Sequence, residues 1–178
     1  MRWHLGAVFA TLIVAGSSRA QQPQITWGST AKTSVFVELL GNGGLLTWNL
    51  DRKLNQRTTL RLGYGNYHSI ELGDQEPKHY RTYTAMLNGL AGGPTLWMEA
   101  GIGGRIGSHR IDAYTLPSKR FRDVTAVIGI RRQPLDGGFV FRAGFTPRYV
   151  IESELDYRPG YRPPRLSGGA GASIGVAF

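Results

Sequence analysis

The chain ends in the sequence GASIGVAF, residues 171–178. Apolar side chains occupy every second position of this stretch and small residues lie between them, which is the period of a β-strand with one apolar face. A soluble protein rarely leaves such an edge open, because unpaired backbone invites aggregation. A closed barrel has no edge, and closure is obligatory in lipid. The stretch therefore predicts the last strand of a membrane-spanning β-barrel.

The same alternation recurs along the chain. In each stretch apolar residues lie on one face, and glycine, polar or charged residues lie on the other. The predicted strands are residues 33–40, 45–53, 58–67, 79–91, 95–106, 123–132, 139–150 and 168–178. A soluble lipocalin-like barrel also has eight strands, but it would carry its apolar residues inside. Here the charged residues share a face with the glycines, so we expect the apolar face to meet lipid.

The lengths of the connections carry independent information. After a first hairpin at residues 41–44, Gly-Asn-Gly-Gly, they run short, long, short, long, short, long. The Asn-Gly pair suits positive φ. Membrane barrels have short periplasmic turns and longer outer loops. With both termini in the periplasm, every long loop falls outside, so the predicted fold is an all-β, eight-stranded antiparallel up-and-down transmembrane β-barrel.

The two ends of the predicted barrel resemble known proteins. Gly171, Ile174, Val176 and Phe178 resemble the carboxy-terminal signal of bacterial outer-membrane β-barrel proteins. The first hairpin is similar to that of uncharacterised small outer-membrane barrels and, loosely, to the OmpA-like transmembrane domain. The resemblance implies a place in the outer membrane of a Gram-negative bacterium. It also implies that these four residues form an insertion signal for the barrel-assembly machinery.

The amino-terminal residues read as a cleaved export signal. Arg2 and His4 precede an apolar run over residues 5–16, and residues 18–20, Ser-Arg-Ala, offer a small-x-small cleavage site. The run is shorter than the roughly 20 residues of a spanning helix, although an amino-terminal membrane anchor is the alternative. The expected organisation is a signal at residues 1–20, a periplasmic segment at residues 21–32 that is loosely placed, and a barrel at residues 33–178.

Charge and cysteine content exclude several classes of protein. The formal net charge is +9, and removal of the signal leaves 19 Lys and Arg against 12 Asp and Glu, or +7. The basic residues are scattered without a recognition helix or a basic stripe, so we expect no nucleic-acid partner, and an anionic membrane surface fits better. The chain has no cysteine, which rules out disulfides, a lipidated cysteine and thiolate metal sites.

Charged residues on the inward face are the most informative group. Phe36, Glu38 and Leu40 share that face of the first predicted strand. The predicted lumen charges are Glu38, Arg61, Glu99 and Arg142 near mid-strand, Asp51 and Arg131 lower, and Arg105 nearer the outer rim. An eight-stranded barrel is only wide enough for side chains to fill it, and buried charges must be paired. We expect an ion-pair network that plugs the lumen; a charge-lined, porin-like pore is the alternative.

Basic residues in two predicted outer loops are candidates for contact with lipid phosphates, which suit arginine forks. They are Arg110, Lys119, Arg120 and Arg122 in one loop, and Arg158, Arg162 and Arg165 in the next. The expected partner is outer-membrane lipid, including lipopolysaccharide, and the expected state is a monomer. Ordinary solvated charge is the alternative.

Catalysis has a weak candidate in His68, Ser69 and Glu71. Neighbouring residues of a strand point to opposite faces, which spoils a nucleophile–base pair. The cluster also lacks the surroundings expected of PagP-like acyltransferases and PagL-like deacylases. We therefore expect no catalytic residue, metal or cofactor, and a structural or interaction protein. A lipid A-modifying enzyme or a narrow transporter is the alternative function.

Overall fold

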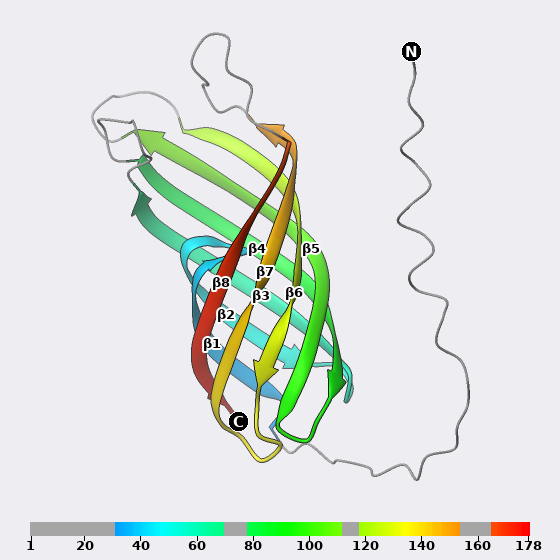
Figure 1. The fold of residues 1–178 in the computed structure, drawn as a ribbon. Helices are drawn as coiled ribbons and strands as arrows, with labels where there is room; N and C mark the ends of the chain where they lie inside the picture. Colours follow the sequence, from blue (N-terminus) through cyan, green and yellow to red (C-terminus); the bar gives the residue numbers. More distant parts are fainter. Residues whose placement is uncertain (1–30, 70–77, 112–117, 154–164) are drawn as a thin grey trace, which may run out of the picture.

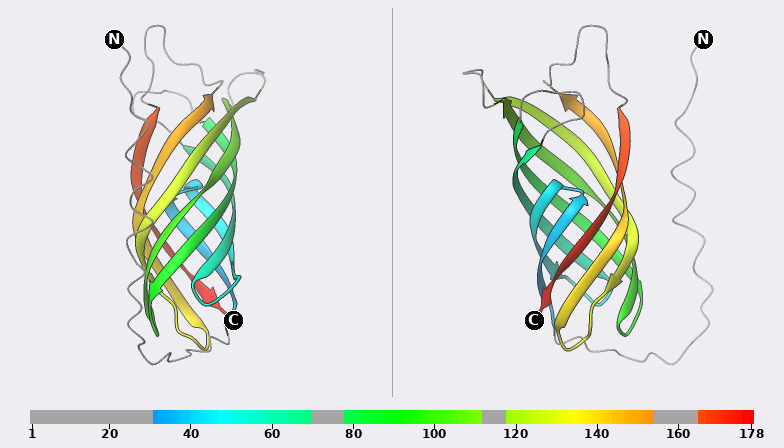
Figure 2. Two further views of the ribbon diagram at one scale, coloured as in Figure 1. Left: turned by 90° about the vertical axis from the view of Figure 1, so that its right-hand side faces the viewer. Right: turned by 60° about the vertical axis from the view of Figure 1, so that its left-hand side comes forward.

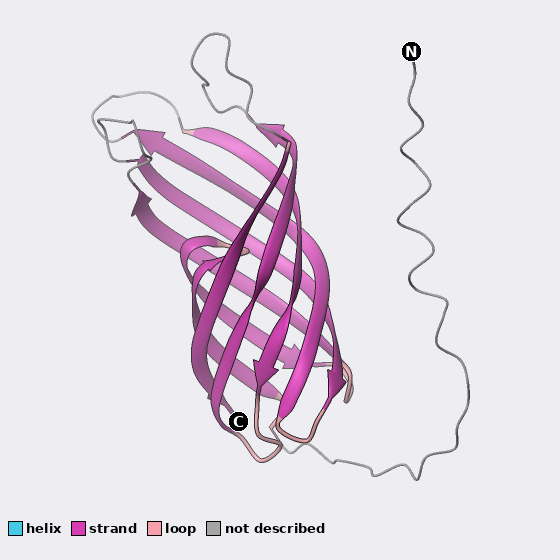
Figure 3. Cartoon of the chain, in the orientation of Figure 1, coloured by secondary structure: helices cyan, strands magenta, loops and turns pink. Residues whose placement is uncertain are grey.

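The computed structural model describes residues 31–69, 78–111, 118–153 and 165–178. These residues form eight β-strands that follow one another around a closed barrel (Figure 1). No helix occurs in the described ranges (Figure 3). The strands are β1 (Thr33–Gly41), β2 (Gly44–Lys53), β3 (Thr58–Ser69), β4 (Lys78–Gly92), β5 (Leu96–Ile111), β6 (Lys119–Arg132), β7 (Gly138–Ser153) and β8 (Leu166–Ala177).

Every strand pairs with its sequence neighbours in antiparallel fashion, and β8 returns to β1 to close the ring. The closing ladder joins Ser34 to Ala177 at one end and Leu39 to Ala172 at the other. Closure leaves no free sheet edge over the paired part of the strands. The predicted eight-stranded antiparallel up-and-down fold is confirmed.

Side chains alternate between the interior and the outer surface. In β4, Thr82, Thr84, Met86 and Asn88 are buried, whereas the residues between them are exposed. The exposed set is mainly apolar around the whole barrel; Ile102 is 62% exposed, for example. The terminal strand follows the same rule, with Ile174, Val176 and Phe178 exposed. A continuous apolar outer surface of this size is unfavourable in water and matches the lipid-facing band of a membrane barrel.

Within the described ranges, the chain forms no helix long and apolar enough to cross a membrane.

Several strands extend further into the predicted outer loops than the sequence indicates. β5 continues to Ile111 and β6 begins at Lys119, so the loop predicted after residue 106 is much shorter. Arg110 therefore lies on β5, and Lys119, Arg120 and Arg122 lie on β6, rather than in a loop. The physical reason is that a ladder continues as long as both strands can pair. Polar outward residues above the apolar band do not interrupt it.

The β1–β2 hairpin differs from its neighbours because it ends part of the way up the barrel wall (Figure 2). The positive φ angles expected at Asn42 and Gly43 occur instead at Leu40, with φ 57°, and Gly44, with φ 119°. Leu40, predicted to point inward, is 61% exposed. The turn bends inward between these two residues, and Asn42 is therefore fully buried within the barrel.

The turn residues contact the opposite wall. The Thr82 hydroxyl of β4 donates to the carbonyl oxygen of Gly43 at 2.7 Å, and the side-chain amide nitrogen of Asn42 donates to Thr125 Oγ1 of β6 at 2.6 Å and to Ala126 O at 2.9 Å. The hairpin tip therefore lies inside the lumen and forms part of its filling.

The residues that precede β1 pack against the end of the barrel that holds the short turns. The Ala31 amide donates to Leu135 O at 3.1 Å, and the Lys53 amide donates to Lys32 O at 2.8 Å. Ala31 packs with Val140 and Ala177 in a small buried cluster. Ala31 and Lys32 are thus fixed to the barrel, although the segment was expected to be loosely placed. The predicted signal and residues 21–30 lie outside the described residues.

Candidate functional site

Four ion pairs between described residues lie in the barrel interior, and the first joins β1 to β3. Arg61 Nη1 lies 3.1 Å from Glu38 Oε1, and the two side chains are 1% and 5% exposed. Thr47 donates its hydroxyl to the other carboxylate oxygen of Glu38 at 3.4 Å. Both charges occupy the inward positions that the strand alternation predicts, near the middle of the barrel.

The second pair joins β5 to β7. Arg142 Nε donates to Glu99 Oε2 at 2.8 Å, and Arg142 Nη2 contacts the other carboxylate oxygen. This two-pronged arrangement engages Nε and Nη2 of the planar guanidinium and is among the stronger charge-assisted contacts, while Nη1 is buried without a hydrogen-bond partner among the described residues. The ring of Phe36 from β1 packs against it, with the guanidinium carbon of Arg142 4.5 Å from the ring centroid. The guanidinium of Arg61 lies 5.9 Å from the same ring, so Phe36 lies between the two pairs.

The third pair crosses the whole lumen. Arg131 on β6 contacts Asp51 on β2 through Nη1 and Oδ2, and each side chain is only 1% exposed. β2 and β6 are opposite one another in the ring of eight strands. Arg131 also donates from Nη2 to Ser34 Oγ at 3.2 Å and contacts Gln133 Oε1. One guanidinium therefore connects β1, β2 and β6 toward the end of the barrel that holds the short turns.

The fourth pair includes a residue that the sequence argument missed. Arg105 on β5 donates from Nε to Asp123 Oδ2 at 2.8 Å, and Asp123 is 4% exposed. The two residues are direct partners in the β5–β6 ladder. Asp123 was taken only as the start of a strand. Its inward position follows from the alternation of that strand, since the next residue, Val124, is exposed on the outer surface.

The four pairs together account for all seven predicted lumen charges and Asp123. No side chain in them is more than 9% exposed. Charges buried this far from water are tolerated only when they are paired and hydrogen-bonded. Three of the pairs connect strands that are not neighbours in the sheet, and the Arg105–Asp123 pair joins the neighbouring strands β5 and β6.

The basic residues proposed to contact lipid lie at the outer strand ends. Arg110, Arg120, Arg122 and Arg165 are exposed, and Lys119 is half-exposed. Arg122 Nη1 lies 3.5 Å from Glu152 Oε2 across the β6–β7 ladder, with both side chains more than half exposed. Arg158 and Arg162 lie outside the described residues.

Of the three catalytic candidates, only the His68 side chain is described by the structure. The His68 ring is exposed and stacks on His79, with ring centroids 4.7 Å apart, and His79 Nε2 contacts Asn66 Oδ1. The side chain of Ser69 and the whole of Glu71 lie outside the described residues. Among the residues that are described, no three His, Asp or Glu side chains are grouped so that they could hold a metal ion.

Comparison with known proteins identifies the fold. No protein-family model matches the sequence, and no curated protein matches it. The N-terminal β-barrel domain of Pseudomonas aeruginosa OprF superimposes with a TM-score of 0.60 at 16% identity, over 83% of this chain and 96% of that domain. Ail, the attachment invasion locus protein of Yersinia pestis, gives a TM-score of 0.44 at 10% identity, over 83% and 97%. The chain therefore has the eight-stranded, OmpA-like barrel fold of bacterial outer-membrane proteins.

Proposed function

We propose that this chain is a bacterial outer-membrane barrel with a plugged lumen, and that it acts as a structural or interaction protein through its outer end. Export by the amino-terminal signal and assembly through the Phe178 end belong to the same proposal. The apolar outer surface and the fold shared with the OprF barrel domain support the location. The interior, which is crossed by charge pairs instead of being lined by free charge, supports the plug.

The Asp51–Arg131 pair is the single observation that carries the proposal. It spans the lumen from β2 to the opposite strand β6, and neither side chain is accessible to water. An eight-stranded barrel has room for such side chains but not for a water-filled channel beside them. An ion entering from the outer side would have to separate a buried pair in order to pass.

Planar-bilayer recordings test the plug. We expect no steady conductance from the wild-type barrel. The double variant Asp51→Ala/Arg131→Ala removes the crossing pair while the Glu38–Arg61 and Glu99–Arg142 pairs remain, so it should conduct more than the wild type. The matched control is Arg122→Ala/Glu152→Ala, which removes an exposed pair and should remain silent. A stable channel formed by the wild type would refute the plugged lumen and support the charge-lined pore.

The outer strand ends are the proposed contact with lipopolysaccharide. Arg120 and Arg165 are exposed there, and guanidinium groups match phosphate oxygens in pairs. Vesicles with lipopolysaccharide should raise the unfolding midpoint of the wild type above its value in phosphatidylcholine alone. Arg120→Gln/Arg165→Gln should reduce that increase, whereas Arg57→Gln, in the exposed turn between β2 and β3, should not. Equal increases in all three proteins would remove the contact.

The enzyme alternative has its own measurement. If the barrel is structural, deletion or overexpression should leave the acyl pattern of lipid A unchanged in a mass profile. A reproducible change in that pattern would favour a lipid A-modifying enzyme instead.

A further inference from the structure

The short β1–β2 hairpin leaves a gap in the outer part of the barrel wall. The β1–β8 ladder stops at Leu39 and Ala172, and the β2–β3 ladder stops at Thr47 and Gly65. Beyond these points β8 continues to Leu166 and β3 continues to Ser69, and neither has a partner strand on this side in the described part of the chain (Figure 2). The gap lies between β8 and β3, directly above the hairpin.

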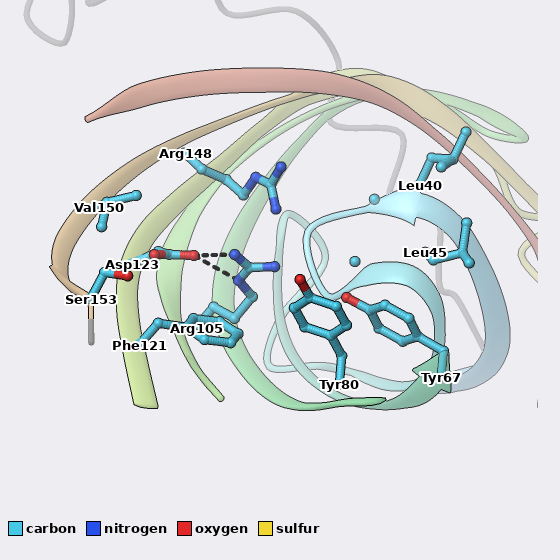
Figure 4. A pocket seen from close by; sticks show the side chains of 12 residues that line it. Leu40, Leu45, Tyr67, Tyr80, Arg105, Phe121, Asp123, Arg148, Val150 and Ser153 are labelled. Carbon is cyan, nitrogen blue, oxygen red and sulfur yellow. Dashed lines mark hydrogen bonds and ion pairs between the residues drawn. The ribbon is translucent and has the colours of Figure 1, made fainter. Parts of the chain in front are cut away.

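A pocket of about 350 Å³ lies behind this gap. The hairpin tip forms its floor, because the Tyr67 hydroxyl packs against the Cα of Gly44 while the buried turn fills the lumen beneath. Figure 4 shows the side chains that surround it: Leu40 and Leu45 at the hairpin, Tyr67 and Tyr80 on one wall, and Phe121, Arg105, Asp123, Arg148 and Val150 on the other. The pocket is therefore closed below and has openings toward the outside and through the gap.

The polar groups in this pocket carry one uncompensated positive charge. Asp123 is held by Arg105, whose guanidinium also lies 4.8 Å from the Phe121 ring centroid. Arg148 from β7 points into the pocket (Figure 4) and is partly buried, yet it makes no hydrogen bond or ion pair with any described residue. Asp123 is still shared electrostatically by the two arginines, and the net positive charge that remains favours an anionic ligand with paired oxygens.

The wall opposite Arg148 is a ladder of stacked rings. Tyr67 and Tyr80 stack with centroids 5.4 Å apart, and Tyr80 stacks on His109 at 5.5 Å. Both tyrosine hydroxyls face the pocket (Figure 4). The rings supply flat apolar area and the hydroxyls supply hydrogen bonds, so the pocket suits a polar head joined to an apolar body.

The height of the gap sets which part of the membrane it opens into. Unpaired strand edges are not tolerated in hydrocarbon, so the gap must lie at the headgroup level. The outer face of β3 agrees, because it changes from the aromatic Tyr64 to the exposed polar residues Asn66 and His68 at this point. Below the gap, Leu40 is 61% exposed and Leu45 is 41% exposed, which gives the opening an apolar lower rim.

We propose that this pocket binds the anionic head of a membrane amphiphile, a carboxylate or phosphate on an acyl chain. Arg148 holds the anion, and the chain passes over Leu40 and Leu45 through the gap into the outer leaflet. The proposal rests on the membrane placement proposed above, but it adds a binding site that a purely structural barrel does not need.

Titrations of the barrel in phosphatidylcholine nanodiscs test the site, with the Arg148 side-chain resonance and the Gly44 amide followed by NMR. Insertion is checked separately by the heat-induced shift in electrophoretic mobility. Dodecyl phosphate and oleate should produce saturable shifts at both positions. Inorganic phosphate should bind at least tenfold more weakly, and dodecyltrimethylammonium, with the same chain but a positive head, should cause no shift.

Variants separate the charge from a structural effect. Arg148→Gln should weaken dodecyl phosphate binding at least tenfold, followed at the Gly44 amide, and Arg148→Lys should stay within about threefold of the wild type. The control Arg81→Gln changes an exposed arginine on the outer face of β4 and should bind as the wild type does. Equal binding by Arg148→Gln, or equal binding of inorganic phosphate and dodecyl phosphate, would overturn the proposal. A barrel that fails to insert would overturn the membrane placement as well, whereas one that inserts and does not bind would overturn only this site.

Discussion

Replacing Glu99 with alanine leaves Arg142 charged and buried without its carboxylate. The Arg142 guanidinium gives Nε to Glu99 at 2.8 Å and contacts the second oxygen through Nη2, and its side chain is only 4% exposed. Removal of one partner from such a pair destabilises proteins by about 3–5 kcal/mol. The remaining contact with the Phe36 ring, at 4.5 Å, partly compensates the charge. We therefore expect a loss near the lower end, about 3 kcal/mol.

Urea unfolding of the barrel in lipid vesicles measures this loss. With a slope of about 2 kcal/mol per molar urea, the midpoint should fall by roughly 1.5 M. Tryptophan fluorescence reports the transition, since Trp97 is buried and Trp48 is exposed on the outer surface. Cold electrophoresis gives an independent measure of the folded fraction.

The matched control is Glu152→Ala, which removes a carboxylate from a pair whose side chains are 66% and 59% exposed. Exposed pairs contribute about 0–1 kcal/mol, so this change should be nearly silent. The double variant Glu99→Ala/Arg142→Met removes the stranded charge and should recover most of the loss. The reasoning is refuted if Glu99→Ala and Glu152→Ala unfold at the same urea concentration.

Two further predictions concern packing and assembly. Gly103→Ala should destabilise the barrel by about 1–3 kcal/mol, because the added Cβ would lie 2.0 Å from the Ala85 carbonyl oxygen. The control Gly104→Ala, whose Cβ would have its nearest contact with Asp123 O at 3.9 Å, should unfold at nearly the wild-type midpoint. An equal loss of stability in both variants would contradict the steric argument. Phe178→Asp places a charge on a side chain that is 67% exposed on the lipid-facing surface and changes the proposed insertion signal, so its outer-membrane level should drop well below that of Phe178→Tyr. Normal levels of the aspartate variant would remove the terminal phenylalanine from the assembly signal.

The alternation of the strands was readable from the sequence because a strand repeats every two residues and one face of this sheet is apolar throughout. The same rule placed Glu38, Arg61, Glu99 and Arg142 inside, since a charge on the apolar face would meet lipid. The number and order of strands followed from the turns between the alternating stretches. The outer ends of the strands could not be predicted from the sequence, because above the apolar band a paired strand and a loop are equally polar.

The partner of each charge depends on the closed barrel. Asp51 lies directly opposite Arg61 in the β2–β3 ladder, and Arg131 lies opposite Arg142 in the β6–β7 ladder. If each charge interacted only with its ladder partner, Asp51 would pair with Arg61, and Arg131 and Arg142 would repel each other. Closure of the barrel brings β2 across from β6, so Asp51 forms an ion pair with Arg131, while Arg61 forms one with Glu38.

The hairpin shows the same division between sequence and tertiary structure. The Gly-rich turn at residues 41–44 was evident in the sequence, but its inward bend comes from contacts of Asn42 and Gly43 with β6 and β4. Those contacts join residues that are far apart in the chain and meet only when the ring is complete. The gap beside the hairpin and the position of Arg148 behind it have the same origin. Side-chain direction is thus a local property of each strand, whereas the choice of partner is a property of the barrel as a whole.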